Sequence, residues 1–531
     1  MPRIVLLGEP GSGKSTLAKE ISRHIRAVLI ESSTAVIYPI AALSYLPNEK
    51  TLLNKLGRLS THKPTSVSRE RAVEIYRLVS ETYSSDFIAR ALHHRYLEQS
   101  AKRTIIFSGL RGYDNATYCR LHNDFLIYLT ADTATLIKRL VENRAYNKKQ
   151  AAAELKNEQA LYRTRAIKKI ANLVIDTTKY DILEIAQKII QAIQREYQMC
   201  QHCVNTARNP AIKIGNDGYC QICSAYLKYF DPKHLKDELR FLHSFKNRAE
   251  QKYDVMVGIS GGKDSTATLA TIKKMGFRPL AFTFNLGYLP KTTIPRARMI
   301  AKRLGVDFEL IDIRPYIRRI DRESYKKMAA LYELPFTLQT KEKFIAAYTE
   351  GRQHYSVRCK HSPTFVRSCQ LCRRMVIRAY YAEAIKRDIP AIVLGINEWT
   401  NLSAAQRGGA YRVSGVRTLR PTPQASPVHV FHLPFLLQMT STDTKRILHS
   451  VGWTAPKGED FIESNSNSCL FARSTERDAK RLLGFHPDST RLSREVTVGF
   501  ITKRQALKAL KKIHPYKYTP RQVLERMGIL K

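Results

Sequence analysis

Apolar and polar positions along the chain form two separate series of predicted strands and helices. In the first series, short continuous apolar runs predict buried strands at residues 3–7, 103–107 and 125–129. Amphipathic stretches of that series predict helices at residues 17–25, 69–79, 87–97 and 134–140. In the second series, apolar runs predict strands at residues 255–259, 280–284, 308–311 and 391–394. Strands that alternate with helices are typical of parallel sheets, so we predict an α/β fold with two doubly wound domains.

The segments around these two series predict the rest of the organisation. We expect four domains, at residues 1–195, 196–240, 241–450 and 451–531. The first and third are the sheet domains, the second is a small cysteine-rich module, and the fourth is a C-terminal extension. Residues 403–428 are rich in glycine, proline, serine and arginine, which predicts a mobile loop. Residues 490–531 predict a basic helical tail.

Composition and charge narrow the class of protein. The chain has 531 residues, of which 44% are hydrophobic, so intrinsic disorder, a collagen and a disulfide-stabilised miniprotein are excluded. Its apolar runs are shorter than the ~18–20 residues that span a bilayer, and its N-terminus does not match a secretory signal. We therefore expect a soluble cytoplasmic protein without a membrane partner. The net charge of +42 favours a nucleic acid partner, and we expect tRNA or another RNA.

A glycine-rich loop forms the first candidate nucleotide site. The sequence from Gly8 to Ser15, Gly-Glu-Pro-Gly-Ser-Gly-Lys-Ser, follows a predicted strand and precedes a predicted helix. This is the P-loop pattern, in which backbone N–H groups surround phosphate oxygens at the positive end of a helix. We expect Lys14 to reach the β- and γ-phosphates of ATP and the Ser15 hydroxyl to bind Mg²⁺. The predicted nucleotide contacts here are Gly8, Gly11, Gly13, Lys14 and Ser15.

The region around this loop resembles small P-loop nucleotide kinases of the adenylate or dephospho-CoA kinase type. The resemblance rests on the loop, on Gly109-Leu110-Arg111 and on the segment from Leu136 to Arg144. It implies that Arg111, Arg139 and Arg144 clamp phosphates across a lid. One position departs from the family, because the second buried strand ends in Ser108 where an aspartate usually helps to hold the metal. We therefore expect nucleotide binding, and leave open whether this domain transfers a phosphoryl group.

A second loop defines the second nucleotide site. Ser260-Gly261-Gly262-Lys263-Asp264-Ser265 lies between a predicted buried strand and a predicted helix. It resembles the pyrophosphate loop (PP-loop) of the N-type ATP pyrophosphatases, which have a HUP-like fold and cleave ATP into AMP and pyrophosphate to adenylate a carbonyl oxygen. The hydroxyls and amides would form an anion nest, and Lys263 would balance developing charge. We expect Asp264 to bind Mg²⁺, and the resemblance places an adenine contact at Asn285.

Four cysteines predict a structural zinc site between the two sheet domains. Their spacing, Cys200-x2-Cys203-x16-Cys220-x2-Cys223, is that of a two-knuckle, zinc-ribbon-like tetrathiolate site. The sequence around it resembles the start of N-acetyl sugar amidotransferases, PP-loop enzymes that receive ammonia from a glutaminase partner. Residues 492–496 and 499–506 resemble the C-terminal pattern of the same family.

A third group of cysteines points to a different nucleophile. Cys369-x2-Cys372, followed by two arginines and later by Cys469, resembles the tRNA two-thiocytidine-type sulfurtransferases. In that family three such thiolates hold a [4Fe–4S] cluster with one open iron that carries sulfur. Two alternatives stay open: a second zinc site that includes Cys359, and a redox pair at Cys369 and Cys372 with Cys469 as a core residue. We also regard Cys359 as a candidate sulfur carrier, and Cys119 as a buried packing residue.

Three functional hypotheses follow. The first is an ATP-dependent RNA base sulfurtransferase that receives sulfur from a donor partner; its catalytic residues would be Lys263, Asp264, Cys369, Cys372 and Cys469. The second is an N-acetyl sugar amidotransferase with a glutaminase partner, and the third is a non-enzymatic nucleotide-gated RNA-binding regulator. The predicted cofactors are ATP, Mg²⁺, Zn²⁺ and a candidate [4Fe–4S] cluster. Arg412, Arg417 and Arg420 are candidates for binding pyrophosphate or the RNA backbone, and a solvated loop is the alternative. A C-terminal group beside Tyr516 and Tyr518 suits RNA phosphates and stacked bases, with an ordinary basic helix as the alternative; its cations are Lys508, Lys511, Lys512, Lys517 and Arg521.

Overall fold

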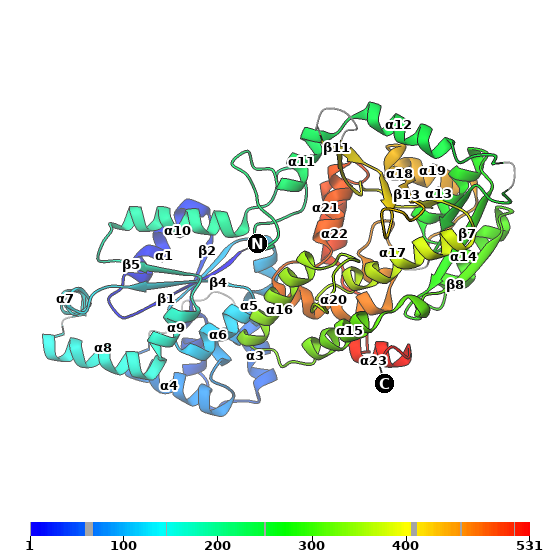
Figure 1. Cartoon of the computed structure of the whole chain (residues 1–531). Coiled ribbons are helices and arrows are strands. Elements are labelled where there is room, and N and C mark those ends of the chain that lie inside the picture. Colours follow the sequence, from blue (N-terminus) through cyan, green and yellow to red (C-terminus); the bar gives the residue numbers. More distant parts are fainter. Residues whose placement is uncertain are drawn as a thin grey trace. The chain divides into compact units, whose positions relative to one another are not determined.

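The computed structural model describes residues 2–58, 67–144, 146–248, 251–404, 411–456, 459–514 and 516–530 (Figure 1). The chain divides into two compact units. The first unit consists of Met1–Tyr197 with Phe336–Leu338, and the second of Gln198–Pro335 with Gln339–Lys531. The finer division into four domains stays a prediction. Among the helices of the described residues, none combines the length and the apolar character that crossing a lipid bilayer requires.

The first unit is built on a parallel sheet of five strands in the order β2-β3-β1-β4-β5. The strands are β1 (Arg3–Gly8), β2 (Val28–Glu31), β3 (Ile105–Ser108), β4 (Phe125–Thr130) and β5 (Leu173–Asp176). The three strands predicted from apolar runs are all present. The two edge strands, β2 and β5, were not predicted, because their partly exposed residues do not form a continuous buried run.

Helices cover both faces of this sheet, as a doubly wound fold requires (Figure 1). Successive residues of β1 point to opposite faces: Ile4 and Leu6 pack with α1 and α10, whereas Val5 and Leu7 pack with α5, α6 and their neighbours. The helices are α1 (Lys14–Ile25), α2 (Tyr38–Ala41, preceded by a π-helix at Ser33–Ile37), α3 (Glu49–Arg58), α4 (Arg69–Thr82), α5 (Phe87–Lys102), α6 (Tyr113–Leu121), α7 (Thr133–Arg144), α8 (Lys148–Tyr162), α9 (Thr164–Ile170) and α10 (Ile182–Tyr197).

The second unit contains a six-stranded sheet in the order β12-β13-β9-β6-β7-β8, parallel except for the edge strand β12. Its strands are β6 (Val255–Gly258), β7 (Pro279–Asn285), β8 (Phe308–Asp312), β9 (Ala391–Leu394), β12 (Val416–Leu419) and β13 (Val428–His432). Apart from it, β10 (Asn401–Ala404) and β11 (Tyr411–Ser414) form an antiparallel pair. The four strands predicted for the second series are all present as β6 to β9.

Two apolar cores lie on the two faces of the second sheet. One core joins the strands to α12, α13, α14 and α18, and the other joins them to α15, α17, α20 and α23. The helices of this unit are α11 (Gln221–Tyr229), α12 (Pro232–His243), α13 (Lys263–Lys274), α14 (Thr293–Arg303), α15 (Arg319–Tyr332), α16 (Leu338–Gln353), α17 (Ser368–Lys386), α18 (Leu433–Leu436), α19 (Ser441–Ser450), α20 (Leu470–Leu483), α21 (Ser489–Thr497), α22 (Lys503–Lys511) and α23 (Pro520–Arg526). The C-terminal tail is helical, as predicted, and Leu492, Ala506 and Leu524 on it are buried.

The prediction of a mobile loop at residues 403–428 was wrong for part of its length. Residues 411–414 and 416–419 form β11 and β12, and residues 405–410 lie outside the described residues. Val413 is fully buried, and Gly415 is packed so closely that an added Cβ would lie 2.5 Å from Leu436 Cδ2. Gly415 therefore permits close packing. Composition alone cannot distinguish a glycine that permits close packing from one that makes a loop flexible.

Both sheets place a glycine-rich loop where the strand order changes direction. In the first sheet β1 lies between β3 and β4, and in the second β6 lies between β7 and β9. Connections that leave such a central strand diverge and open a crevice at its carboxyl end, which is where doubly wound folds bind their ligands. The loops after Gly8 and Gly258 occupy these two positions.

Candidate functional site

The loop after β6 forms a compact nest in front of α13. The Ser260 and Ser265 hydroxyl oxygens lie 3.2 Å apart, the Ser260 N–H donates to Ser265 Oγ at 3.2 Å, and Ser265 Oγ donates to the Gly262 carbonyl at 3.1 Å. Gly261 has a φ of +70°. A side chain there would also collide with α14, because an added Cβ would lie 2.8 Å from Arg296 Cγ. The sequence Ser-Gly-Gly therefore creates a tight turn that aims backbone N–H groups at an anion.

Lys263 and Asp264 begin α13 and form an ion pair. Lys263 Nζ also lies 5.1 Å from the ring centroid of Phe461 and 5.3 Å from that of Phe500. The other carboxylate oxygen of Asp264, Oδ1, is buried and has no hydrogen-bond partner among the described residues. A buried carboxylate oxygen without a donor suits a hard divalent cation, so the site has the donor that Mg²⁺ needs.

Two residues from distant parts of the chain hold this loop in place. Trp453 Nε1 donates to the Gly261 carbonyl at 3.0 Å. Gly395, at the end of β9, lies against the start of α13, and an added Cβ would be 2.7 Å from the carbonyl carbon and oxygen of Asp264. Because both contacts involve backbone atoms, the loop cannot shift independently of β9 and Trp453.

The PP-loop residues line a cavity of about 680 Å³ together with Cys369, Cys372 and Cys469, the three cysteines predicted as cluster ligands. Cys369 and Cys372 are the second and fifth residues of α17, and Cys469 is the N-cap of α20. Asn465 Nδ2 donates to Cys369 Sγ at 3.4 Å, and the Ala472 N–H donates to Cys469 Sγ at 3.4 Å. The structure thus brings together residues that lie more than a hundred positions apart in the sequence.

Burial controls the chemistry of these three thiols. It raises the pKa of Cys369, that of Cys372 to about 12, and that of Cys469 still further. Unliganded, all three are thus neutral thiols at physiological pH. Two helix N-termini favour negative charge at these positions, but burial opposes it. A bound metal would supply the positive charge that stabilises the thiolates. The three cysteines are not among the groups of described residues whose donor atoms all lie within 4.8 Å of one another.

A second cavity adjoins the first and is strongly basic. It has a volume of about 1290 Å³ and shares Arg373 and Arg417 with the PP-loop cavity. The residues that line it include seven arginines, one lysine and three tyrosines, and none of them is acidic. We call it the basic cavity; its cations are Arg318, Arg319, Arg358, Lys360, Arg373, Arg378, Arg417 and Arg420. Burial, with Arg373 nearby, lowers the pKa of Arg417 to about 10, so this guanidinium is still charged at neutral pH.

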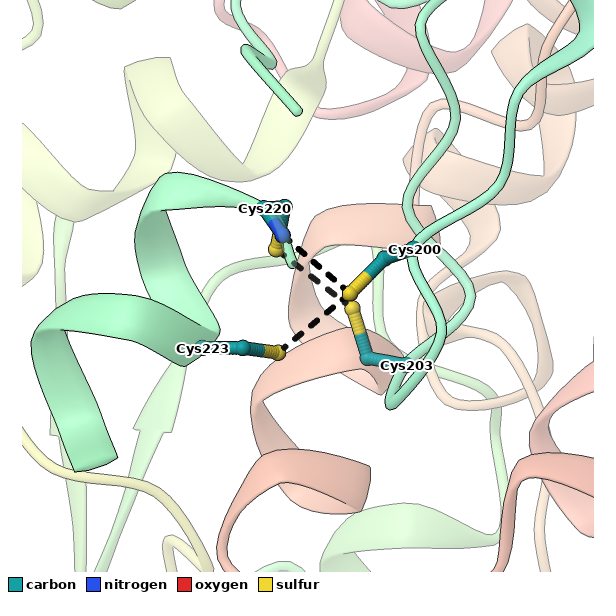
Figure 2. A group of neighbouring side chains, drawn as sticks. All are labelled: Cys200, Cys203, Cys220 and Cys223. Atoms are coloured by element: carbon teal, nitrogen blue, oxygen red, sulfur yellow. Dashed lines mark hydrogen bonds between the residues drawn. The ribbon is translucent and has the colours of Figure 1, made fainter. Parts of the chain in front are cut away.

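The four cysteines of the predicted zinc module converge in the second unit (Figure 2). All four are fully buried, and their sulfur atoms lie within 4.8 Å of one another. The Cys200–Cys223 and Cys203–Cys220 sulfur separations are 3.8 Å and 3.6 Å. A tetrahedral metal with bonds of about 2.3 Å requires sulfur separations of about 3.8 Å. Hydrogen bonding between the sulfur atoms lowers the pKa of Cys220 and raises that of Cys203 and Cys223, so within the group Cys220 is the thiol that ionises most readily. The four residues can therefore bind a metal ion.

This module packs against α21 and α22 at the C-terminal end of the chain. The cysteines share an apolar cluster with Leu492, Val496 and Phe500. Lys503 Nζ donates to the Cys200 carbonyl at 2.6 Å, and Thr497 Oγ1 lies 3.2 Å from Cys223 Sγ. The two segments that resemble sugar amidotransferases are therefore neighbours in space.

In the first unit, the P-loop lines a cavity of about 1070 Å³. Gly11, Gly13, Lys14 and Ser15 line it, and the three predicted arginines, Arg111, Arg139 and Arg144, line the same cavity. Gly8 lies behind the loop in β1, where its carbonyl accepts a hydrogen bond from Lys14 Nζ at 2.8 Å. The structure therefore places every predicted residue of this site within one region.

The three arginines of this cavity are held by the protein itself. Arg111 pairs with Glu158, Arg144 lies 4.0 Å from Glu154, and Arg139 donates to Thr177 Oγ1 at 3.0 Å. Glu31, at the end of β2, lies opposite Ser108 on β3 and lines the cavity. A carboxylate is therefore present beside the position where the sequence lacked an aspartate, although it comes from a strand that the sequence did not predict.

Some predicted residues lie elsewhere. Asn285 ends β7, and its side-chain oxygen accepts a hydrogen bond from the Gly287 N–H at 3.0 Å; Leu286 lines the PP-loop cavity, and Asn285 is not among the residues that do. Cys359 lines the basic cavity. Cys119 is fully buried, as predicted. Trp453 and His432 line the PP-loop cavity but belong to no recognisable motif, so sequence reasoning missed them. Glu495 also lines this cavity, and it lies in the segment 492–496 that resembles the sugar amidotransferases.

Comparison with protein families gives two matches, one in each unit. Residues 4–162 match the model described as AAA domain, and residues 254–374 match the model described as Queuosine biosynthesis protein QueC. The first region is P-loop kinase-like, and the second is a PP-loop domain of the ATP pyrophosphatase family. Together they define an ATP-using enzyme with a PP-loop. Each model covers less than a third of the chain.

Solved structures resemble the chain only distantly. A shikimate kinase from Acinetobacter baumannii in complex with shikimate has 15% identity and a TM-score of 0.24, and the match covers 36% of this chain and 93% of that one. An uncharacterized protein from Eubacterium ventriosum ATCC 27560 has 15% identity and a TM-score of 0.23, with coverage of 36% and 99%. A search of curated proteins returns no match.

Proposed function

We propose that this protein is an ATP-dependent sulfurtransferase that adenylates a carbonyl group of an RNA base and replaces its oxygen with sulfur. One observation carries the proposal: Cys369, Cys372 and Cys469 line the same cavity as the PP-loop. A sulfur-delivering group and an adenylated carbonyl must come within bonding distance, and a shared cavity of about 680 Å³ provides that proximity.

The first chemical step uses the PP-loop. The Ser260–Ser265 nest holds the phosphates of ATP, and Asp264 Oδ1 binds the Mg²⁺ that accompanies them. The carbonyl oxygen of the base attacks the α-phosphorus, and the bond to the β-phosphate breaks, so pyrophosphate leaves. Lys263 stabilises the negative charge that develops on the bridging oxygen. The product is an O-adenylated base whose original oxygen is now part of a good leaving group.

The second step replaces that oxygen. A hydrosulfide equivalent from a sulfur donor attacks the activated carbon, and AMP departs with the original oxygen. The three cysteines suit a [4Fe–4S] cluster, because they are soft thiolate ligands, three in number, at two helix N-termini. Such a cluster, when bound, would supply sulfur next to the activated carbon. Trp399 and Tyr380 in the cavity wall help to exclude water, which would otherwise hydrolyse the adenylate.

The RNA partner is proposed from the basic cavity. The cavity is lined by eight cations. One of them, Arg378, forms an ion pair with the Asp321 carboxylate. Tyr316, Tyr355 and Tyr381 lie among these cations. A single-stranded RNA segment has phosphates that attract cations and bases that stack on aromatic rings. Because the basic cavity shares Arg373 and Arg417 with the PP-loop cavity, RNA bound there has a base within reach of the nucleotide.

A second candidate function is an amidotransferase that uses ammonia from a glutaminase partner. Its supporting observation is the packing of the four-cysteine module on α21 and α22, which joins the two segments of that family resemblance. We propose that zinc occupies the module in either case. The amidotransferase proposal gives no role to the cysteine triad or to the basic cavity.

The test is anaerobic purification followed by iron and sulfide analysis and a product assay. With ATP, Mg²⁺, sulfide and tRNA, we expect AMP and pyrophosphate in equal amounts and a thiolated nucleoside detectable by mass spectrometry. Lys263→Ala should lower AMP formation at least 100-fold. Cys369→Ala should lose iron and thiolation.

The matched control is Cys119→Ala, since Cys119 is buried in the first unit. It should retain iron and thiolation. An iron-free wild-type protein that turns over with ammonia, and that Cys369→Ala leaves unaffected, would instead establish the amidotransferase. Formation of ADP alone by both wild type and Lys263→Ala would refute both candidates.

A further inference from the structure

A loop between α16 and α17 carries three metal-binding side chains that the proposed function does not use. His354, Cys359 and His361 lie within eight positions of one another. His354 and Cys359 are partly buried, and His361 is exposed. Their donor atoms, one nitrogen from each histidine and the cysteine sulfur, all lie within 4.8 Å of one another.

The loop is anchored on both sides of this group. The Cys359 carbonyl accepts a hydrogen bond from Arg374 Nη2 at 3.2 Å, and Arg374 is completely buried. The Ser362 carbonyl accepts one from Lys327 Nζ at 2.7 Å. These contacts hold the backbone, so the three side chains converge from a positioned loop.

The distance between the two imidazole nitrogens has the value that a metal ion requires. His354 Nδ1 and His361 Nε2 are 3.3 Å apart. Zinc binds histidine at about 2.0–2.1 Å in tetrahedral geometry, which places two such nitrogens about 3.3 Å apart. Without a metal the same distance requires one imidazole to donate a proton to the other. Cys359 Sγ donates to the His361 carbonyl at 3.6 Å, a contact that keeps the sulfur beside the two rings.

A comparable cluster in the first unit differs in how its side chains are paired. His93, Cys119 and Asp124 also have donor atoms within 4.8 Å. There the Asp124 carboxylate is occupied, because it binds His93 Nε2 at 2.6 Å and also pairs with Arg3. Cys119 is buried, and burial raises its pKa well above the usual value. The contacts of the Asp124 carboxylate explain why His93, Cys119 and Asp124 lie together. The group of His354, Cys359 and His361 contains no carboxylate, so this explanation does not apply to it.

We propose that His354, Cys359 and His361 bind one zinc ion, separate from the four-cysteine site. Imidazole and thiolate are the donors that zinc prefers, and three protein ligands leave the fourth tetrahedral position open for water or an anion. Cys359 also lines the basic cavity, with Arg358 and Lys360 on either side of it. The ion would therefore fix the segment of the loop that forms one wall of that cavity.

The test measures zinc per chain in the full-length protein by mass spectrometry of the metal. His361→Ala and Cys359→Ser should each contain one zinc ion fewer than the wild type. His243→Ala is the matched control, since His243 is an exposed histidine of the same unit, and it should match the wild type. Equal zinc contents in the wild type, His361→Ala and Cys359→Ser would overturn the proposal.

A second measurement separates metal loss from misfolding. With the protein loaded with Co²⁺, the wild-type minus His361→Ala difference spectrum should show a thiolate–cobalt charge-transfer band from a single thiolate. Hydrogen exchange of residues 354–362 should become at least tenfold faster in His361→Ala, while that of residues 200–223 stays unchanged. A difference spectrum without a band, or unchanged exchange at residues 354–362, would contradict the site.

Discussion

At the scale of single residues, the PP-loop depends on a glycine outside its motif. An added methyl group at Gly395 would lie 2.7 Å from backbone atoms of Asp264, which have no freedom to move away. We expect Gly395→Ala to destabilise the second unit by about 1–3 kcal/mol, the usual cost of overpacking, and to lower AMP formation at least tenfold. Denaturant titration and the product assay measure the two effects. Gly57→Ala is the control, because among the described residues its methyl group would meet only two His94 ring atoms, at 3.5 and 3.6 Å.

His432 makes the second unit sensitive to acid. Burial lowers its pKa to about 3, despite a hydrogen bond between its Nδ1 and the Glu398 carbonyl at 2.7 Å. Between pH 6.5 and 3 the unfolded chain therefore binds a proton that the folded chain does not. The free energy of unfolding should fall by about 1.4 kcal/mol from pH 7.5 to 5.5 through this group. His432→Gln should reduce the fall, whereas His243→Gln should preserve it, as denaturant titrations at both pH values would reveal.

The residues of the two nucleotide loops could be predicted because their spacing is local. Gly11, Lys14, Ser260 and Lys263 each belong to a run of six to eight positions that one strand–loop–helix turn explains. Trp453 is different: it supports Gly261 from nearly two hundred positions away, through a single hydrogen bond. Such contacts depend on tertiary packing, which leaves no periodic or local signal in one sequence.

At the scale of elements, the four-cysteine module is expected to depend on its metal. Its cysteines are fully buried in a small cluster with α21 and α22, and apolar burial there is limited. Cys220→Ser should remove one zinc ion and destabilise the second unit by about 3 kcal/mol or more, because metal binding and folding are coupled. Metal analysis and thermal unfolding measure both. Cys119→Ala should leave the zinc content unchanged; loss of stability without loss of zinc in Cys220→Ser would contradict the metal site.

Three short edge strands that sequence patterns missed share a physical cause. The longer edge strand β8 was predicted, and the interior strand β13 was missed as well. The central strands β1, β4, β6 and β9 are buried on both faces, so they appear as continuous apolar runs. The edge strands β2, β5 and β12 are partly exposed and only four residues long, and β12 lies in a segment whose glycines and prolines indicated a loop. Edge strands are stabilised by the sheet beside them, so their own residues carry a weak signal.

At the scale of the whole molecule, the net charge of +42 can attract RNA most strongly where cations lack acidic neighbours. Arg358, Lys360 and Arg420 are exposed at the basic cavity, which has no acidic lining residue. We expect the affinity for a single-stranded RNA to fall steeply with salt, because each neutralised phosphate releases a counterion and contributes a slope of about −0.7. Changing these three residues to glutamine should make the slope shallower by about 2. Fluorescence anisotropy over a salt series measures it.

The control for this prediction keeps the net charge of the variant and changes only the location of the lost cations. Lys326, Arg240 and Arg446 are exposed in the same unit, and each forms an ion pair with a carboxylate on its own helix. Because those carboxylates already neutralise them, glutamine at these three positions should leave the slope within about 0.5 of the wild type. Equal slopes for the two triple variants would mean that RNA responds to total charge alone. The basic cavity would then not be the RNA site, and the proposed route of a base toward Lys263 would fail with it.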